Sequence, residues 1–232
     1  LTATRTGSSF DVGSAGIGTL SISDGGKVAV ASSTLLGATT TGSGTVTISG
    51  DGSKLTSADN ISVGERGAGT LNVTDGGEAA SSKNVYFGNY EGSSGTATIS
   101  GSGSKLTSAL AFDVGKAGTG TLNVTDGGAV DIGGTFTVGR DSSGSGTVTI
   151  SGNGSKLTAT GRTYVGRIGN GTLNITNGAE AIFTKGPYLS RDRNATGTVT
   201  ISGSGSKLTA AGLMSVGAVG TGVLTISDGG TA

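Results

Sequence analysis

The stretch that decides the fold is TGTLNVTDGGAVDIGGTFTVG, residues 119–139. Leu122 and Val124 alternate with polar residues, which is the period of a strand with one buried face. An Asp-Gly-Gly turn follows, because glycine accepts a positive φ and aspartate favours turns. Residues 129–132 alternate again, Gly133-Gly134 turns, and residues 135–139 form a third alternating run. The stretch therefore predicts one coil made of three short strands and three turns.

The same coil recurs along the whole chain, marked by the tripeptide Gly-Thr-Leu or Gly-Thr-Val, with Gly-Thr-Ala once at Thr96. Its threonines are separated by 26 and 25 residues in strict alternation, and Val223 takes the ninth place: Thr19, Thr45, Thr70, Thr96, Thr121, Thr147, Thr172 and Thr198. A period in this range is typical of a solenoid. Two kinds of coil therefore alternate, and the full unit is a pair of coils.

Equivalent apolar residues should stack from coil to coil and fill a narrow core. The first strand supplies the column Leu20, Val46, Leu71, Ala97, Leu122, Val148, Leu173, Val199 and Leu224. The third strand supplies Val12, Leu36, Val63, Phe87, Val114, Val138, Val165, Leu189 and Val216. Because crossovers between parallel strands are overwhelmingly right-handed, we expect an all-β, right-handed, single-stranded parallel β-helix (β-solenoid). It would have about nine coils in a single repeat domain over residues 1–232.

Composition excludes several classes of function. The chain has 48 glycines, no cysteine, no histidine, and 15 basic against 15 acidic residues. A balanced charge gives no field to attract nucleic acid, and no apolar run reaches the ~20 residues of a membrane span. Without cysteine or histidine, thiolate metal sites and Ser-His-Asp triads are unavailable. Coil length varies by at most one residue after Thr19, so no long loop is expected to wall a catalytic cleft. We expect no catalytic residues, no metal and no cofactor.

The turn aspartates Asp24, Asp75, Asp126 and Asp228 recur on alternate coils. One carboxylate on every second coil cannot supply the six to eight oxygens that calcium takes. They are interpreted as turn residues.

The repeat has a recognisable pattern. One coil reads Val-Gly-x-x-Gly-x-Gly-Thr-Leu-x-Ile-x-Asp-Gly-Gly, and the next reads Gly-Thr-Val-Thr-Ile-Ser-Gly-x-Gly-Ser-Lys-Leu-Thr, as at residues 146–158. This alternation resembles a repeat of the passenger domains of type V secreted proteins (autotransporters), many of them adhesins. The resemblance implies an extracellular location at the bacterial cell surface, as the passenger of an outer-membrane protein. It also implies adhesion or autoaggregation, with host or matrix polysaccharide, or identical chains, as partners. Since the chain starts and stops inside coils, we expect it to be a segment of a longer passenger.

One column breaks the monotony of the repeat. The residue after each third-strand Val-Gly forms the series Ser14, Ala38, Glu65, Asn89, Lys116, Arg140, Arg167, Arg191 and Ala218. Its four consecutive cations should form a basic line, with Tyr164 and Tyr188 as neighbours and Arg193 close by. Arginine forks suit carboxylate and sulfate groups, and flat rings suit sugar faces. The predicted ligand site for acidic glycans is therefore Lys116, Arg140, Tyr164, Arg167, Tyr188, Arg191 and Arg193. The alternative is a solvated turn column, neutralised locally by Asp141 and Asp192.

Two further functions remain open. Thr-x-Thr pairs at Thr45/Thr47, Thr96/Thr98, Thr147/Thr149 and Thr198/Thr200 form outward columns, as in ice-binding solenoids, although asparagine interrupts them on the coils between. Threonine also simply suits strand exteriors. A purely structural stalk or filament subunit is the other alternative, because the open strand edges of a solenoid invite end-to-end stacking.

Overall fold

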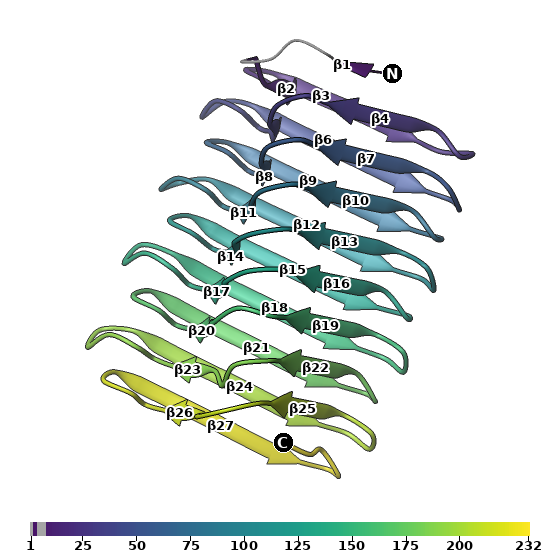
Figure 1. The fold of residues 1–232 in the computed structure, drawn as a ribbon. Coiled ribbons are helices and arrows are strands. Elements are labelled where there is room, and N and C mark those ends of the chain that lie inside the picture. Colours follow the sequence, from purple (N-terminus) through teal and green to yellow (C-terminus); the bar gives the residue numbers. More distant parts are fainter. Residues whose placement is uncertain (1, 4–7) are drawn as a thin grey trace.

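The computed structural model describes residues 2–3 and 8–232 as a stack of rungs, each of which crosses three parallel sheets. Figure 1 shows the rungs following one another from the N-terminus to the C-terminus. The described residues contain strands and turns and no helix. The predicted all-β parallel solenoid with three strands per coil is confirmed; its handedness stays a prediction.

Within the described residues each sheet has nine strands, one from each rung. The long-strand sheet consists of β3 (Ile17–Ile22), β6 (Ser43–Ser49), β9 (Ala68–Thr74), β12 (Ser94–Ser100), β15 (Thr119–Thr125), β18 (Ser145–Ser151), β21 (Asn170–Thr176), β24 (Thr196–Ser202) and β27 (Thr221–Ser227). The middle sheet consists of β1 (Thr2–Ala3), β4 (Lys27–Val30), β7 (Lys54–Ser57), β10 (Glu78–Ser81), β13 (Lys105–Ser108), β16 (Ala129–Ile132), β19 (Lys156–Ala159), β22 (Glu180–Phe183) and β25 (Lys207–Ala210). The short-strand sheet consists of β2 (Phe10–Val12), β5 (Thr34–Leu36), β8 (Ile61–Val63), β11 (Val85–Phe87), β14 (Phe112–Val114), β17 (Phe136–Val138), β20 (Thr163–Val165), β23 (Tyr188–Leu189) and β26 (Ser215–Val216).

Register confirms the predicted columns. Leu122 of β15 pairs with Val148 of β18, and Thr121 pairs with Thr147. In the short-strand sheet, Val138 lies between Val114 and Val165. Because each rung repeats the same alternation, every strand presents its apolar residues to the same side, and the core runs the length of the stack.

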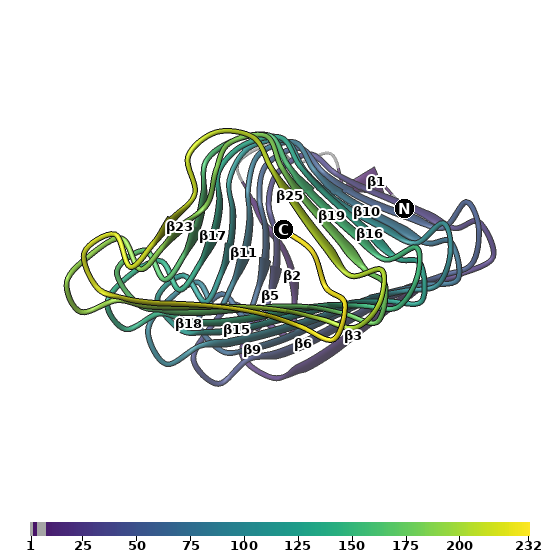
Figure 2. The ribbon, with the colours of Figure 1, turned by 90° about the horizontal axis from the view of Figure 1, so that it is seen from below.

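Viewed along the stack, the long strands form a flat layer, and the other two sheets lean together on one side of it (Figure 2). The interior includes a ladder of phenylalanines, in which Phe112 lies 5.4 Å from Phe87 and 6.0 Å from Phe136, centroid to centroid. Phe183, from the middle sheet, extends it at 6.1 Å from Phe136. Edge and tilted contacts at these distances are the arrangements that aromatic rings prefer.

The turn after each long strand explains why two kinds of coil alternate. Asp126 has a φ of 54°, so the aspartate itself adopts the left-handed conformation together with Gly127. The Gly127 amide then donates to Ser155 Oγ of the following rung at 3.1 Å. Ser155 belongs to the Gly-Ser-Lys-Leu-Thr motif, and its hydroxyl donates to Ser151 O at 2.7 Å. An Asp-Gly-Gly coil therefore needs a serine-bearing coil after it to satisfy its turn. The interpretation of these aspartates as turn residues is confirmed.

Candidate functional site

The outward residues of the short-strand sheet form the floor of the candidate site, and we call them the groove column. From the first rung to the last they are Asp11, Leu35, Ser62, Tyr86, Asp113, Thr137, Tyr164, Tyr188 and Ser215, each paired in register with the next. On one side of the groove column lies the apex turn, which connects each middle-sheet strand to the next short strand, as at residues 109–111. On the other side lies the outer turn, which connects each short strand to the next long strand, as at residues 115–118. Sequence alternation correctly places this column outside the core, but Asp113 is only 1% exposed and Tyr164 only 6%. The flanking turns therefore cover part of it.

Near the C-terminal end, aromatic rings and guanidinium groups gather. The Tyr164 and Tyr188 rings stack at 5.8 Å with an interplanar angle of 28°. Arg191 Cζ lies 5.4 Å from the Tyr164 centroid and Arg167 Cζ lies 5.8 Å from it. Arg162, on the apex turn, hydrogen-bonds to Tyr164, which raises the pKa of the guanidinium. These five residues are named the tyrosine–arginine patch.

A shallow depression of about 370 Å³ lies at this patch, lined by Arg162, Tyr164, Tyr188, Arg191 and Asp192 among others. Sequence reasoning missed Arg162, because it lies on the apex turn and not in the column that follows Val-Gly. Arg193 is exposed, and neither Arg193 nor Arg167 lines the depression.

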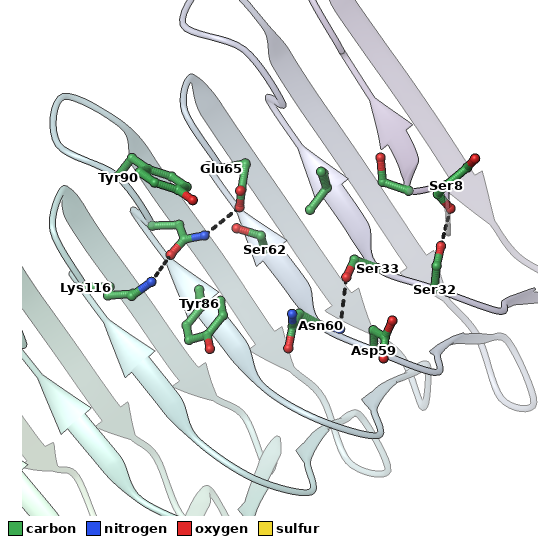
Figure 3. Close-up of a pocket in the computed structure, with 13 residues that line it drawn as sticks. Ser8, Ser32, Ser33, Asp59, Asn60, Ser62, Glu65, Tyr86, Tyr90 and Lys116 are labelled. Atoms are coloured by element: carbon green, nitrogen blue, oxygen red, sulfur yellow. Dashed lines mark hydrogen bonds between the residues drawn. The ribbon is translucent and has the colours of Figure 1, made fainter. Parts of the chain in front are cut away.

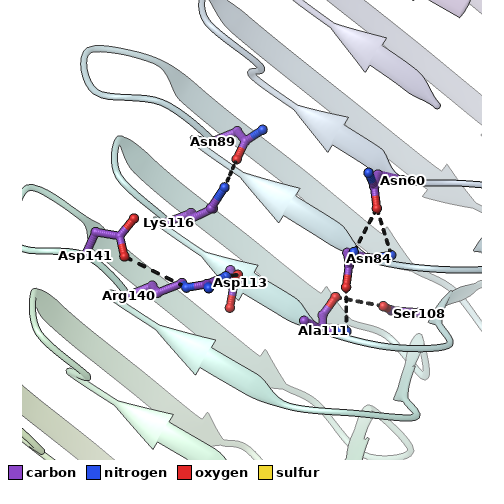
Figure 4. Close-up of polar contacts among 9 residues, drawn as sticks. All are labelled: Asn60, Asn84, Asn89, Ser108, Ala111, Asp113, Lys116, Arg140 and Asp141. Carbon is purple, nitrogen blue, oxygen red and sulfur yellow. Dashed lines mark hydrogen bonds and ion pairs between the residues drawn. The ribbon is translucent and has the colours of Figure 1, made fainter. Parts of the chain in front are cut away.

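The two remaining predicted cations face other partners, as Figure 4 shows. Lys116 Nζ donates to Asn89 Oδ1 at 2.7 Å and lies 4.6 Å from the Tyr86 ring. Arg140 Nη1 donates to Asp113 Oδ2 at 2.6 Å, and Arg140 Nε is 3.9 Å from Asp141. The predicted line of four cations is therefore divided. Arg140 pairs mainly with Asp113, while Asp141, a neutralising partner in the alternative interpretation, lies farther away at 3.9 Å.

Burial is the main cause of the pKa shifts of Asp113 and Tyr86, two neighbouring residues of the groove column. It raises the pKa of the Asp113 carboxyl group, and the Arg140 guanidinium opposes that shift only in part. Burial also raises the pKa of Tyr86, helped by the nearby Asp113 carboxylate. Both effects follow from the cost of holding a charge away from water.

A larger depression of about 510 Å³ lies over the N-terminal half of the groove column. Figure 3 shows its side chains converging from both walls: Glu65, Tyr90 and Lys116 from the outer turn, and Asn60 from the apex turn. The walls of this depression are the two short turns themselves, around a floor of short strands, and no long loop contributes to it.

The recurring lysines of the middle sheet have a different role. Lys54, Lys105 and Lys156 pair with Glu78, Asp131 and Glu180 of the following rungs at 2.7, 2.6 and 3.3 Å. All six side chains are about one-third or more exposed, so each pair adds little to stability. They are useful as matched controls, because their charges lie outside the groove.

No helix among the described residues is long and apolar enough to cross a membrane. Within the same residues, no group of three or more histidine, cysteine, aspartate or glutamate side chains is placed to hold a metal ion.

Comparison with known proteins gives limited similarity. No family model matches the chain. The chain is 31% identical over 172 residues to the uncharacterized lipoprotein YdeK of Escherichia coli (strain K12), a match that covers 72% of this chain. It spans only 13% of the length of that relative. Among solved structures, the crystal structure of a TibC-catalyzed hyper-glycosylated TibA55-350 fragment is 18% identical, with coverage of 98% of this chain and 97% of that one. Its TM-score is 0.32, a likeness too small to support an inference.

Proposed function

We propose that this chain is a non-catalytic segment of a bacterial surface-exposed autotransporter passenger that acts in adhesion or autoaggregation. In this proposal the tyrosine–arginine patch binds acidic glycans of a host or matrix polysaccharide. The repeat pattern supports the passenger assignment, and the description of the similar E. coli protein as a lipoprotein supports a location in the cell envelope.

The observation that carries the glycan proposal is the set of unpaired guanidiniums around the stacked tyrosines. Within the described chain, neither Arg167 nor Arg191 forms an ion pair with a carboxylate, in contrast to Arg140. Arg167 Nε is buried and has no hydrogen-bond partner among the described residues. Arg162 and Arg191 line the depression, where a sulfate or carboxylate oxygen would accept charge-assisted hydrogen bonds from their guanidinium groups. The half-buried ring of Tyr188, stacked on the buried ring of Tyr164, offers a sugar an adjacent apolar surface.

The experiment is retention on immobilised heparin, a sulfated polyanion, at low and at rising salt. We expect wild type to be retained at low salt and the double variant Arg167→Ala/Arg191→Ala to elute much earlier. The matched control is Lys105→Ala/Lys156→Ala, which removes the same charge from the middle sheet and should elute close to wild type. No retention of wild type, or equal loss in both double variants, would contradict the proposal.

A structural stalk remains the second candidate, and one observation favours it. None of the residues in the nine strands of the long-strand sheet is charged. The sheet therefore presents a long, uniform face that suits a spacer as well as a binding surface. Light scattering against protein concentration separates the two, since a stacking subunit would grow in mass without any glycan.

A further inference from the structure

The larger, N-terminal depression has a different chemistry from the tyrosine–arginine patch. Its floor is the run Leu35, Ser62 and Tyr86 of the groove column, which pair in register on three successive rungs. At about 510 Å³ it lies within the range of roughly 300–1,000 Å³ that is usual for small-molecule sites. It is thus large enough to hold part of an oligosaccharide.

One wall carries a hydrogen-bonded chain that fixes its polar groups. Lys116 Nζ donates to Asn89 Oδ1 at 2.7 Å, and Asn89 Nδ2 donates to Glu65 Oε2 at 2.6 Å. Asn89 is 7% exposed, so its amide is held in one orientation from both ends. The wall therefore offers an ammonium donor and a carboxylate acceptor at set positions, which is the preorganisation that a specific site needs.

Two aromatic rings flank this chain of polar groups. Lys116 Nζ lies 4.6 Å from the Tyr86 centroid and 5.8 Å from the Tyr90 centroid. Arg66 Cζ lies 4.1 Å from the Tyr90 ring, which holds that ring in place while leaving Tyr90 41% exposed. Rings that are held in place and partly open can contact the apolar face of a ligand at little cost in conformational entropy.

The floor contains a polar group whose hydrogen bond is missing. Ser62 is 1% exposed, and its Oγ has no hydrogen-bond partner among the described residues. Such groups are rare in folded proteins, and each calls for an explanation. A ligand hydroxyl seated over Leu35 and Tyr86 would give Ser62 a partner, once the side chains that enclose the serine shift to admit it.

The charges on the walls select an uncharged ligand. Glu65 would repel an anion and Lys116 would repel a cation, whereas the charge of Asp59 is offset by its ion pair with Lys83 at 2.5 Å. Sugar hydroxyls both donate and accept hydrogen bonds, so they match a site that offers both kinds of group beside aromatic rings. We propose that this depression is a second glycan site, specific for neutral hexose units. This site is separate from the tyrosine–arginine patch, and the proposal holds whether or not that patch binds acidic glycans.

The test uses an array of immobilised neutral oligosaccharides of glucose, galactose and mannose, with heparin as a comparison. In 1 M salt, where charges are screened beyond about 3 Å, wild type should still bind at least one neutral glycan. Tyr86→Ala should weaken that binding by tenfold or more, and Ser62→Ala by about fivefold, the effect of one hydrogen bond. Arg167→Ala/Arg191→Ala should leave it unchanged.

Thermal unfolding shows whether Ser62 serves binding or folding. Because its hydroxyl has no partner in the fold, Ser62→Ala should unfold at an equal or higher temperature than wild type. Ser104→Ala is the matched control, since Ser104 is equally buried but accepts from Gly76 N at 3.0 Å and donates to Ser100 O at 2.7 Å. That variant should lose stability and keep its sugar affinity. The proposal is overturned if no neutral glycan binds, if binding survives both Tyr86→Ala and Ser62→Ala, or if only the arginine variant abolishes it.

Discussion

Arg140 reaches back one rung to donate a 2.6 Å hydrogen bond to Asp113, whose side chain is 1% exposed while that of Arg140 is 31% exposed. Asp113 belongs to the groove column between the two depressions, and Arg140 lies on the outer turn beside it. Burial raises the pKa of Asp113 in spite of this partner. An acid with a raised pKa in the fold favours the native state when protonated. Its contribution is therefore full below the unfolded pKa and is lost as pH rises through the folded pKa.

Replacing Asp113 with asparagine should make this loss visible. Asparagine keeps the size and an acceptor for Arg140 but does not titrate, so the variant lacks the decline in stability that Asp113 causes from acid to neutral pH. The stability of Asp113→Asn minus that of wild type should therefore be more favourable to the variant at neutral pH than at pH 3. Urea unfolding over this pH range measures the difference. A stability difference that does not change with pH, or one that changes in the opposite direction, would refute the assignment.

Glycines at the ends of the short strands should tolerate no side chain. Gly139 has a φ of 71°, and a Cβ there would lie 2.2 Å from the carbonyl oxygen of Asn170 on the next rung. Gly92 has a similar φ of 77°, but a Cβ there meets nothing within 4 Å. Gly92→Ala should cost roughly 1–2 kcal/mol, from the left-handed conformation alone. Gly139→Ala should cost more than about 4 kcal/mol, because the backbone must move. Equal costs by chemical denaturation would show that the rungs are less tightly packed than they appear.

The phenylalanine ladder should be a centre of stability. Phe112 is fully buried between Phe87 and Phe136. Phe112→Ala should lower the free energy of unfolding by about 3–5 kcal/mol. Phe10, which is only partly buried in the second strand, is the control and should cost less. Denaturant unfolding of both variants would test this, and a larger loss at Phe10 would count against the ladder.

The sequence predicts the backbone far better than it predicts the groove. Periodicity places Leu122, Val138 and their equivalents correctly, because identical coils can stack only in register. Where the repeat is broken, the structure adapts locally. Pro187 stands at the position where Thr163 begins the preceding short strand. Its nitrogen carries no hydrogen to donate, so β23 begins one residue later, at Tyr188. Ser190 then stands where the other coils have glycine, with a φ of 60° and its hydroxyl bonded to Ala195 O.

The groove is harder to predict because its side chains choose partners across rungs. The column of residues after Val-Gly contains Glu65, Asn89 and Lys116, and their succession along the stack is visible in the sequence. That they join into one hydrogen-bonded chain depends on side-chain rotamers and on the reach of lysine, which periodicity does not encode. Nor does alternation reveal that an outward residue such as Asp113 is covered by an arginine from the next rung.

Measuring polyanion affinity at several salt concentrations should distinguish the contribution of arginine charge from that of ring stacking at the tyrosine–arginine patch. Arginine acts through its charge, so Arg191→Ala should lower affinity and reduce the slope of log affinity against log salt by about one. Tyr188 carries no charge but stacks on Tyr164 at 5.8 Å. Tyr188→Leu should therefore lower affinity at every salt concentration and leave the slope unchanged. Lys105→Ala, on the middle sheet, should change neither quantity. Tyr188→Leu could instead alter the slope as much as Arg191→Ala does. The Tyr188 ring would then act only by positioning the Arg191 guanidinium, and stacking of a sugar on the ring would not be needed to explain binding.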